Sequence, residues 1–454
     1  MTRDADLRRA MARLWLAPPP GPRNLYASPE FKDLSAACAA WGGGTSVFGL
    51  GTALRALGLP SQFPAGAPEH GLSLDQAVLD LTEALTRTTT TRRYLCPLDL
   101  ADTLPPLRFG SAQVARFASG ELDRLFDGPR MRRYYPRAVF EPRRLAMFQW
   151  LVVETTTSID PRPEARAMPF LFESRDTDTG AIDPHRGTLP ASVEDALAFL
   201  LIAPWEDWST LPQVDWRGFR IPWVHVVDDD LFVRPTPPPH ADSLTIEEWI
   251  AHDHWGEEEE LERPTILPLE DAVSDLEAWS EARWSGFERA RHGPLFETPV
   301  MHFLARGFAS DGVDEVMAHM TAIEAALGTR YDKAPKEHKA VRTGTGRVSA
   351  RIAGLLDDVD AALAYRDLFE VRSAFVHGRG GLDPVSTPQR VQARRLARRV
   401  ASALADLGQM DKRSREAVLE TLRVRGRDAY VAAVEAREAQ DSAADGGAGK
   451  DDAF

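Results

Sequence analysis

Residues 364–381 read AYRDLFEVRSAFVHGRGG, and this stretch carries the clearest pattern in the chain. Its apolar residues follow the i, i+3, i+4 spacing of one buried helix face, and they are Tyr365, Leu368, Phe369, Phe375 and Val376. At about 100° per residue, Arg372 points along the mean direction of that stripe. We therefore predict a helix over residues 359–377 in which the Arg372 guanidinium faces a core or an interface and needs a partner.

His377 follows Arg372 by five positions and directly precedes Gly378. On an unbroken helix the two side chains would point about 140° apart. Gly378 is expected to end the helix, which places His377 at the C-terminus, where the macrodipole favours a protonated imidazole. A histidine that moves protons beside an arginine that holds anionic oxygens suits phosphate chemistry, although such a pair is often only structural.

The same stretch resembles the signature of the HEPN domain family, an arginine closely followed by a histidine, here Arg372-Ser-Ala-Phe-Val-His377. The glycine at 378 is typical of the Apea-like branch. MTAIEAALG (320–328) is similar to a helix of that branch, with Glu324 in the acidic position, and RVSARIAGLLDD (347–358) is similar to its next helix. The resemblance covers about residues 270–410, and the N-terminal part is not recognised.

The resemblance implies an all-α bundle that forms a homodimer with its Arg/His motifs facing each other, and in many members a metal-independent endoribonuclease without a cofactor. In that reaction the 2′-hydroxyl of RNA attacks the adjacent phosphate. His377 is implied as the general acid/base, Arg372 as the group that stabilises the phosphorane, and Ser373 as a residue that orients the substrate. Glu324 has either a catalytic role or, as we favour, the role of neutralising Arg372.

Two functions remain open at this point. The first is an RNase that cleaves tRNA or mRNA as a toxin or antiviral (phage-defence) effector, controlled by an inhibitory or activating partner. The second is a non-catalytic sensor that dimerises and binds a nucleotide or a partner protein. A helix is predicted over 388–407, and one of its faces carries Arg390, Arg394, Arg395, Arg398 and Arg399. This face either binds the phosphates of RNA or is an ordinary solvated helix face.

Length and composition limit the class of protein. The chain has 454 residues, 43% hydrophobic and 27% charged, which predicts two or three folded domains. Two cysteines exclude a disulfide framework and indicate a reducing compartment. With no apolar run of about 18 residues and no signal-like N-terminus, we expect a cytoplasmic protein without a membrane role. The net charge of −14 argues against nucleic-acid binding by the whole surface, but not by a local patch.

Charge also divides the chain. Residues 241–300 hold 16 acidic and 4 basic residues, whereas residues 321–400 hold 9 acidic and 15 basic residues. We expect a helical and loop segment over 1–90, an α+β domain over 91–264 with a proline-rich connector near 234–243, a HEPN-like all-α domain over 265–440, and a disordered tail over 441–454. The predicted fold class is therefore an α+β N-terminal region followed by an all-α, HEPN-like helical bundle.

Smaller motifs are assigned structural roles. GLGTAL (49–54) lacks the third glycine and the preceding strand of a dinucleotide loop, so we predict a turn. His252 and His254 lie in an acidic linker without the spacing of a metal site. Four tryptophans are expected to fill the core of the α+β region rather than a pocket, and they are Trp205, Trp208, Trp216 and Trp223.

Overall fold

The structure is a computed structural model that describes residues 3–17, 24–41, 47–63, 71–169, 189–252, 255, 258–330, 336–378, 384–411 and 413–447. The described residues fall into two compact units. The first lies within Met1–Asp99, Ser111–Ala181 and Ile221–Thr265, and the second within Leu100–Gly110, Ile182–Arg220 and Ile266–Phe454. We had placed residues 100–110 and 182–220 in the α+β domain, whereas both segments belong to the second unit.

The first unit begins with a small helical core. Its helices are α1 (Arg3–Trp15), α2 (Pro29–Ala39), α3 (Val47–Leu57) and α4 (Leu74–Thr86), with the 3-10 turns η1 (Leu25–Ala27) and η2 (Pro60–Gln62). Leucines at helical spacing meet here with no exposed surface, among them Leu7, Leu34, Leu54 and Leu81. The GLGTAL segment lies inside α3, so the predicted turn was wrong. Gly51 is needed there because a Cβ would lie 2.9 Å from the ring of Tyr26.

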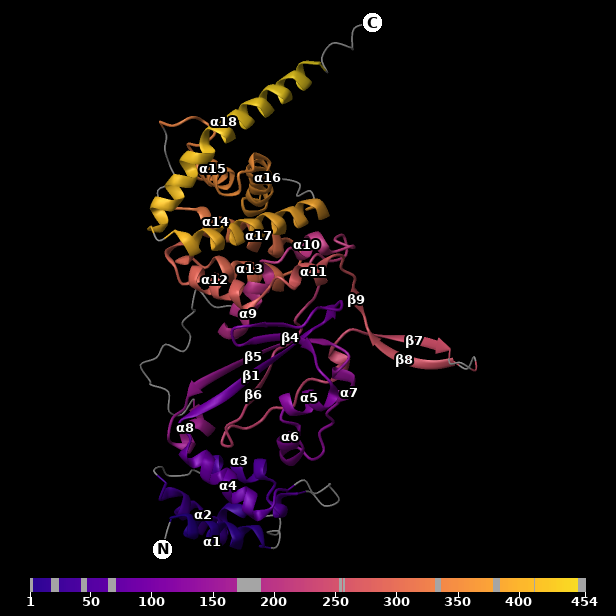
Figure 1. The fold of residues 1–454 in the computed structure, drawn as a ribbon, viewed down its shortest axis with the longest axis vertical. Coiled ribbons are helices and arrows are strands. Elements are labelled where there is room, and N and C mark those ends of the chain that lie inside the picture. Colours follow the sequence, from indigo (N-terminus) through magenta and orange to yellow (C-terminus); the bar gives the residue numbers. More distant parts are fainter. Residues whose placement is uncertain are drawn as a thin grey trace. The chain divides into compact units, whose positions relative to one another are not determined.

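An antiparallel sheet forms the second part of this unit (Figure 1). Its strands run in the order β4 (Ala112–Arg116), β5 (Gln149–Ser158), β1 (Thr89–Leu98) and β6 (His225–Asp228). β1 and β5 pair from Thr89 opposite Ser158 to Leu98 opposite Gln149. Alternate side chains of the sheet, such as Trp150, pack against α5 (Ser119–Leu125) and α7 (Pro142–Leu145). The unit also contains two further short helices, α6 (Gly128–Tyr134) and α8 (Pro163–Ala167).

The acidic segment near residue 250 is not an unstructured linker. β7 (Ile246–His252) and β8 (Glu258–Pro264) pair as an antiparallel hairpin, preceded by the turn η4 (Ala241–Ser243). Trp249 and Ile250 remain exposed on it. His252 lies 3.8 Å from Glu258, while residues 253 and 254 lie outside the described residues.

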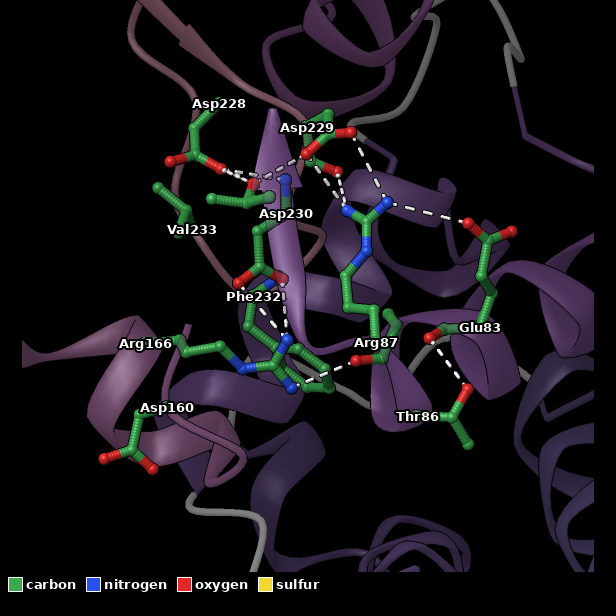
Figure 2. A network of polar contacts seen from close by, with 12 residues as sticks. Glu83, Thr86, Arg87, Asp160, Arg166, Asp228, Asp229, Asp230, Phe232 and Val233 are labelled. Carbon is green, nitrogen blue, oxygen red and sulfur yellow. Dashed lines mark hydrogen bonds and ion pairs between the residues drawn. The ribbon is translucent and has the colours of Figure 1, made fainter. Parts of the chain in front are cut away.

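Three consecutive aspartates, the last residue of β6 and the two that follow it, hold helices of the first unit to the sheet (Figure 2). Each carboxylate forms an ion pair with one arginine. The nitrogen-to-oxygen distances are 3.0 Å for Arg92 and Asp228, 3.1 Å for Arg87 and Asp229, and 3.3 Å for Arg166 and Asp230. Arg130 of α6 adds hydrogen bonds to the backbone carbonyls of Asp228 and Asp230. The Arg166 and Asp230 side chains are 2% and 0% exposed, so this pair is shielded from solvent.

Replacing Asp230 by alanine should leave the buried Arg166 guanidinium without its counter-charge. We expect the free energy of unfolding of the first unit to fall by about 3–5 kcal/mol, measured by native-state hydrogen exchange of the β1 amides. Asp160→Ala is the matched control, because Asp160 pairs with Arg162 at the surface, and it should change little. Equal effects of the two substitutions would contradict this role.

The second unit is largely helical after a few short strands. β2 (Leu100–Ala101) pairs with β9 (Ile266–Leu267), and β3 (Leu107–Phe109) packs against α12. The helices that follow in the chain are α9 (Ala191–Leu201), α10 (Trp205–Trp208), α11 (Ala272–Leu276), α12 (Glu281–Arg291), α13 (Val300–Ala309), α14 (Val313–Leu327), α15 (Gly344–Leu356), α16 (Val359–Val376), α17 (Thr387–Met410) and α18 (Arg415–Gly447), with the turn η5 (Pro294–Phe296).

The predicted fold class is confirmed in its coarse form, a mixed α/β N-terminal region with an antiparallel sheet followed by a largely helical C-terminal region, α13–α18. One prediction within it was wrong, because α18 continues through 441–447, where we expected a disordered tail. Residues 448–454 lie outside the described residues. No described helix is both long and apolar enough to cross a membrane.

Glycines let α15 and α18 lie close together. A Cβ on Gly354 would lie 2.0 Å from the carbonyl oxygen of Leu422, and a Cβ on Gly426 would lie 2.1 Å from that of Ala350. Backbone therefore meets backbone at this crossing, where a larger residue would force the helices apart.

Candidate functional site

The last two turns of α16 carry Arg372, Ser373 and His377. Tyr365 and Leu368, earlier in the helix, are each 1% exposed and lie in the core as predicted. The stripe does not stay buried to its end, because Phe375 and Val376 are 43% and 52% exposed. The prediction that Phe375 and Val376 are buried was therefore wrong for a single copy of the chain.

Arg372 is half-buried and paired with Glu324 of α14. The Arg372 Nη2 atom lies 3.3 Å from the Glu324 Oε2 atom, and the guanidinium lies 5.7 Å from the ring centroid of Phe369. Burial raises the pKa of Glu324, and the positive charge of Arg372 opposes that rise. The neutralising role that we favoured for Glu324 is therefore present in the structure, and it leaves Arg372 oriented by α14.

His377 caps the C-terminus of α16 and is exposed. Its backbone N–H donates to the Ser373 carbonyl at 3.0 Å, and Gly378 follows with a φ of 58°, a left-handed conformation that ends the helix as predicted. Among the described residues, no side chain hydrogen-bonds the His377 imidazole. The ring is therefore open to solvent or to a ligand.

Arg394 of α17 does not belong to a solvated RNA-binding face. Its side chain is 0% exposed, donates to the carbonyl of Leu201, and lies 3.4 Å from the Glu206 carboxylate. Burial lowers the pKa of Arg394 to about 10, an effect that Glu206 opposes. The prediction that Arg394 contacts RNA was wrong, since no phosphate can reach a fully buried guanidinium.

The other arginines of that predicted face are also engaged in ion pairs. Arg395 pairs with Asp207 at 2.6 Å, Arg398 with Asp207 at 2.8 Å and also with Glu206, and Arg399 with Asp358 at 2.8 Å. Their charges are thus largely neutralised within the second unit. The sequence signal that we missed was the Glu-Asp pair between Trp205 and Trp208, which supplies these partners.

Tryptophans complete the same buried cluster. The ring of Trp216 lies 4.7 Å from the Arg394 guanidinium, and its indole N–H donates to Glu315. Trp205 and Trp208 are also buried here, in the second unit rather than in the α+β region where we expected them. Trp223 does pack in the first unit, with its ring centroid 5.7 Å from that of Trp150.

Glu206→Ala should leave Arg394 buried without its carboxylate and lower the free energy of unfolding of the second unit by about 3–5 kcal/mol. Hydrogen exchange of the α17 amides measures this. Arg395→Ala, at a half-exposed pair, should cost under about 1 kcal/mol. The double variant Glu206→Leu with Arg394→Met should recover most of the loss, and a double variant no better than Glu206→Ala would refute the pairing argument.

Arg372→Ala should raise the pKa of Glu324 further, because burial then acts without the opposing charge. A carboxyl group with a higher pKa in the folded than in the unfolded state loses stabilisation as pH rises through the folded value. The variant should therefore be destabilised at about pH 7 and less so at about pH 4. Carboxyl NMR titration and thermal unfolding measure the two effects, and Arg372→Lys is the control that keeps the charge. An unchanged Glu324 pKa would contradict the coupling.

We searched known proteins for relatives of this chain. No family model matches the sequence, and no curated protein or solved structure matches it. The resemblance to the HEPN family therefore depends on the three segments quoted above and on the site residues themselves. Within the described part of the chain, no three His, Cys, Asp or Glu side chains gather as a metal ion would require.

Proposed function

We propose that this protein is a metal-independent endoribonuclease of the HEPN type, acting in the cytoplasm as a homodimer on tRNA or mRNA. The observation that carries the proposal is the arrangement at the end of α16. There Arg372, which is paired with Glu324, lies on the last two turns of the helix, and His377, exposed and without a side-chain partner among the described residues, follows as its C-cap. The resemblance in sequence supplies the reaction type.

In the proposed reaction, His377 takes the proton from the 2′-hydroxyl of RNA. The 2′-oxygen attacks the adjacent phosphorus, and the bond from phosphorus to the 5′-oxygen breaks as that oxygen takes a proton from the protonated His377. The products are a 2′,3′-cyclic phosphate and a 5′-hydroxyl. Arg372 stabilises the charge that develops on the phosphorane oxygens, and Ser373 orients the substrate.

Exposed apolar side chains beside the site support the homodimer. Phe375 and Val376 lie between Arg372 and His377 in the chain, and each leaves about half of its surface to solvent. Large apolar side chains at a functional surface are typical of an interface. Two copies joined here would bring two Arg/His pairs together and bury these side chains.

The test incubates purified wild-type protein with total RNA and a tRNA pool in EDTA and maps the fragment ends. Wild type should leave cyclic phosphates, and His377→Ala and Arg372→Ala should each be slower by at least about 100-fold. His292→Ala is the matched control, because His292 is also an exposed C-terminal cap, of α12. Its activity should be unchanged.

Activity retained in His377→Ala, or abolished by EDTA in the wild type, would refute the proposal. A wild-type protein that is folded, dimeric and inert on every RNA would instead favour the sensor function, in which Phe375 and Val376 serve dimerisation alone.

A further inference from the structure

A cavity of about 410 Å³ lies in the first unit, between the C-terminal ends of α3 and α6. The described residues of its wall combine arginines with aromatic rings and include no aspartate or glutamate. The residues that matter for its chemistry are Arg55, Arg133, Arg137, Phe63, Tyr134 and Tyr135. The volume falls within the range of small-molecule sites, which is about 300–1,000 Å³.

The arginines of this cavity differ in their partners from those described above. Within the part of the chain that the structure describes, Arg55, Arg133 and Arg137 form no ion pair, in contrast to the arginines of α17 and of the aspartate cluster. Arg133 donates through Nε to the carbonyl of Ala56 at 2.6 Å, which fixes its guanidinium in the wall. Burial lowers the pKa of Arg133, an effect that the charges of Asp127 and Asp80 oppose without forming an ion pair with it among the described residues.

The C-terminus of α3 does not supply the missing negative charge, because its last carbonyls are satisfied. The Leu59 N–H donates to the Leu54 carbonyl, the Gly58 N–H to the Arg55 carbonyl and the Leu72 N–H to the Leu57 carbonyl. The Ala56 carbonyl accepts from Arg133. Gly58 has a φ of 80°, as this type of helix cap requires. The wall therefore offers donors and positive charge to a ligand.

Aromatic side chains provide the other half of the recognition. The Tyr134 and Tyr135 ring centroids lie 4.8 Å apart, and the Arg55 guanidinium lies 5.4 Å from the Tyr134 ring. The Tyr135 hydroxyl donates to the carbonyl of Pro235 at 2.8 Å, which holds that ring in place. Flat apolar surfaces of this kind stack on nucleobases.

We propose that this cavity binds a nucleoside phosphate, with the phosphates on Arg55, Arg133 and Arg137 and the base against the aromatic residues. Arginine is suited to phosphate because its planar fork of donors matches two oxygens at once. The cavity holds one nucleotide rather than a strand. This site belongs to the unit that lacks Arg372 and His377, so it goes beyond RNA cleavage and gives the first unit a ligand of its own.

The test uses the full chain carrying His377→Ala, so that RNA cleavage does not enter the measurement. Calorimetry with ATP and GTP should show saturable binding, and adenosine or inorganic phosphate alone should bind at least about tenfold more weakly. Arg137→Glu should weaken nucleotide binding by at least about tenfold, since Arg137 is exposed and its charge is reversed without disturbing a described pair.

Arg143→Glu is the matched control, because Arg143 is an exposed arginine of α7 outside the cavity wall. Equal weakening by Arg143→Glu would show general charge attraction and overturn the proposal. Inorganic phosphate binding as tightly as ATP, tRNA competing at lower concentration than any nucleotide, or no nucleotide binding at millimolar concentration would each overturn it as well. Circular dichroism of each variant checks that the fold is kept.

Discussion

The ion pair between Glu206 and Arg394 is the constraint on which the second unit depends. Both side chains are 0% exposed, and they join α10 to α17 across almost two hundred positions of sequence. Burying two charges costs desolvation free energy, which is offset only if they pair with each other and their remaining polar atoms form hydrogen bonds. This requirement limits the alternative packings of the helices. Once Arg394 is in place, Arg395 and Arg398 meet Asp207 on the same turn.

The first unit uses the same kind of interaction between different elements. The three aspartates at the end of β6 form ion pairs with arginines from β1, from the end of α4 and from α8. Arginine suits this task because a guanidinium offers several fixed donors and stays charged when buried. Only six of the 54 basic residues of the chain are lysines. Much of the arginine content therefore serves internal pairing. The arginines around the α3–α6 cavity differ, because they form no ion pair with any residue that the structure describes.

Much of the candidate site could be predicted from local pattern. The apolar spacing of α16 placed Arg372 on its buried stripe, the resemblance put Glu324 in the acidic position of α14, and Gly378 marked the end of the helix beside His377. The exposure of Phe375 and Val376 could not be predicted in this way. Periodicity gives the direction of a side chain around its own helix, whereas burial depends on how far the neighbouring helices extend.

Local sequence alone was sufficient for the confirmed coarse fold class and the ends of several helices, because spacing, caps and glycines act within a few residues. Only the tertiary structure decided which arginines are buried, which segments join which unit, and where a cavity remains. Arg394 and Arg395 are neighbours on one helix and look alike in sequence, yet one is fully buried and the other half-exposed. The difference comes from partners distant in the chain, since Coulombic and packing energies depend on separation in space.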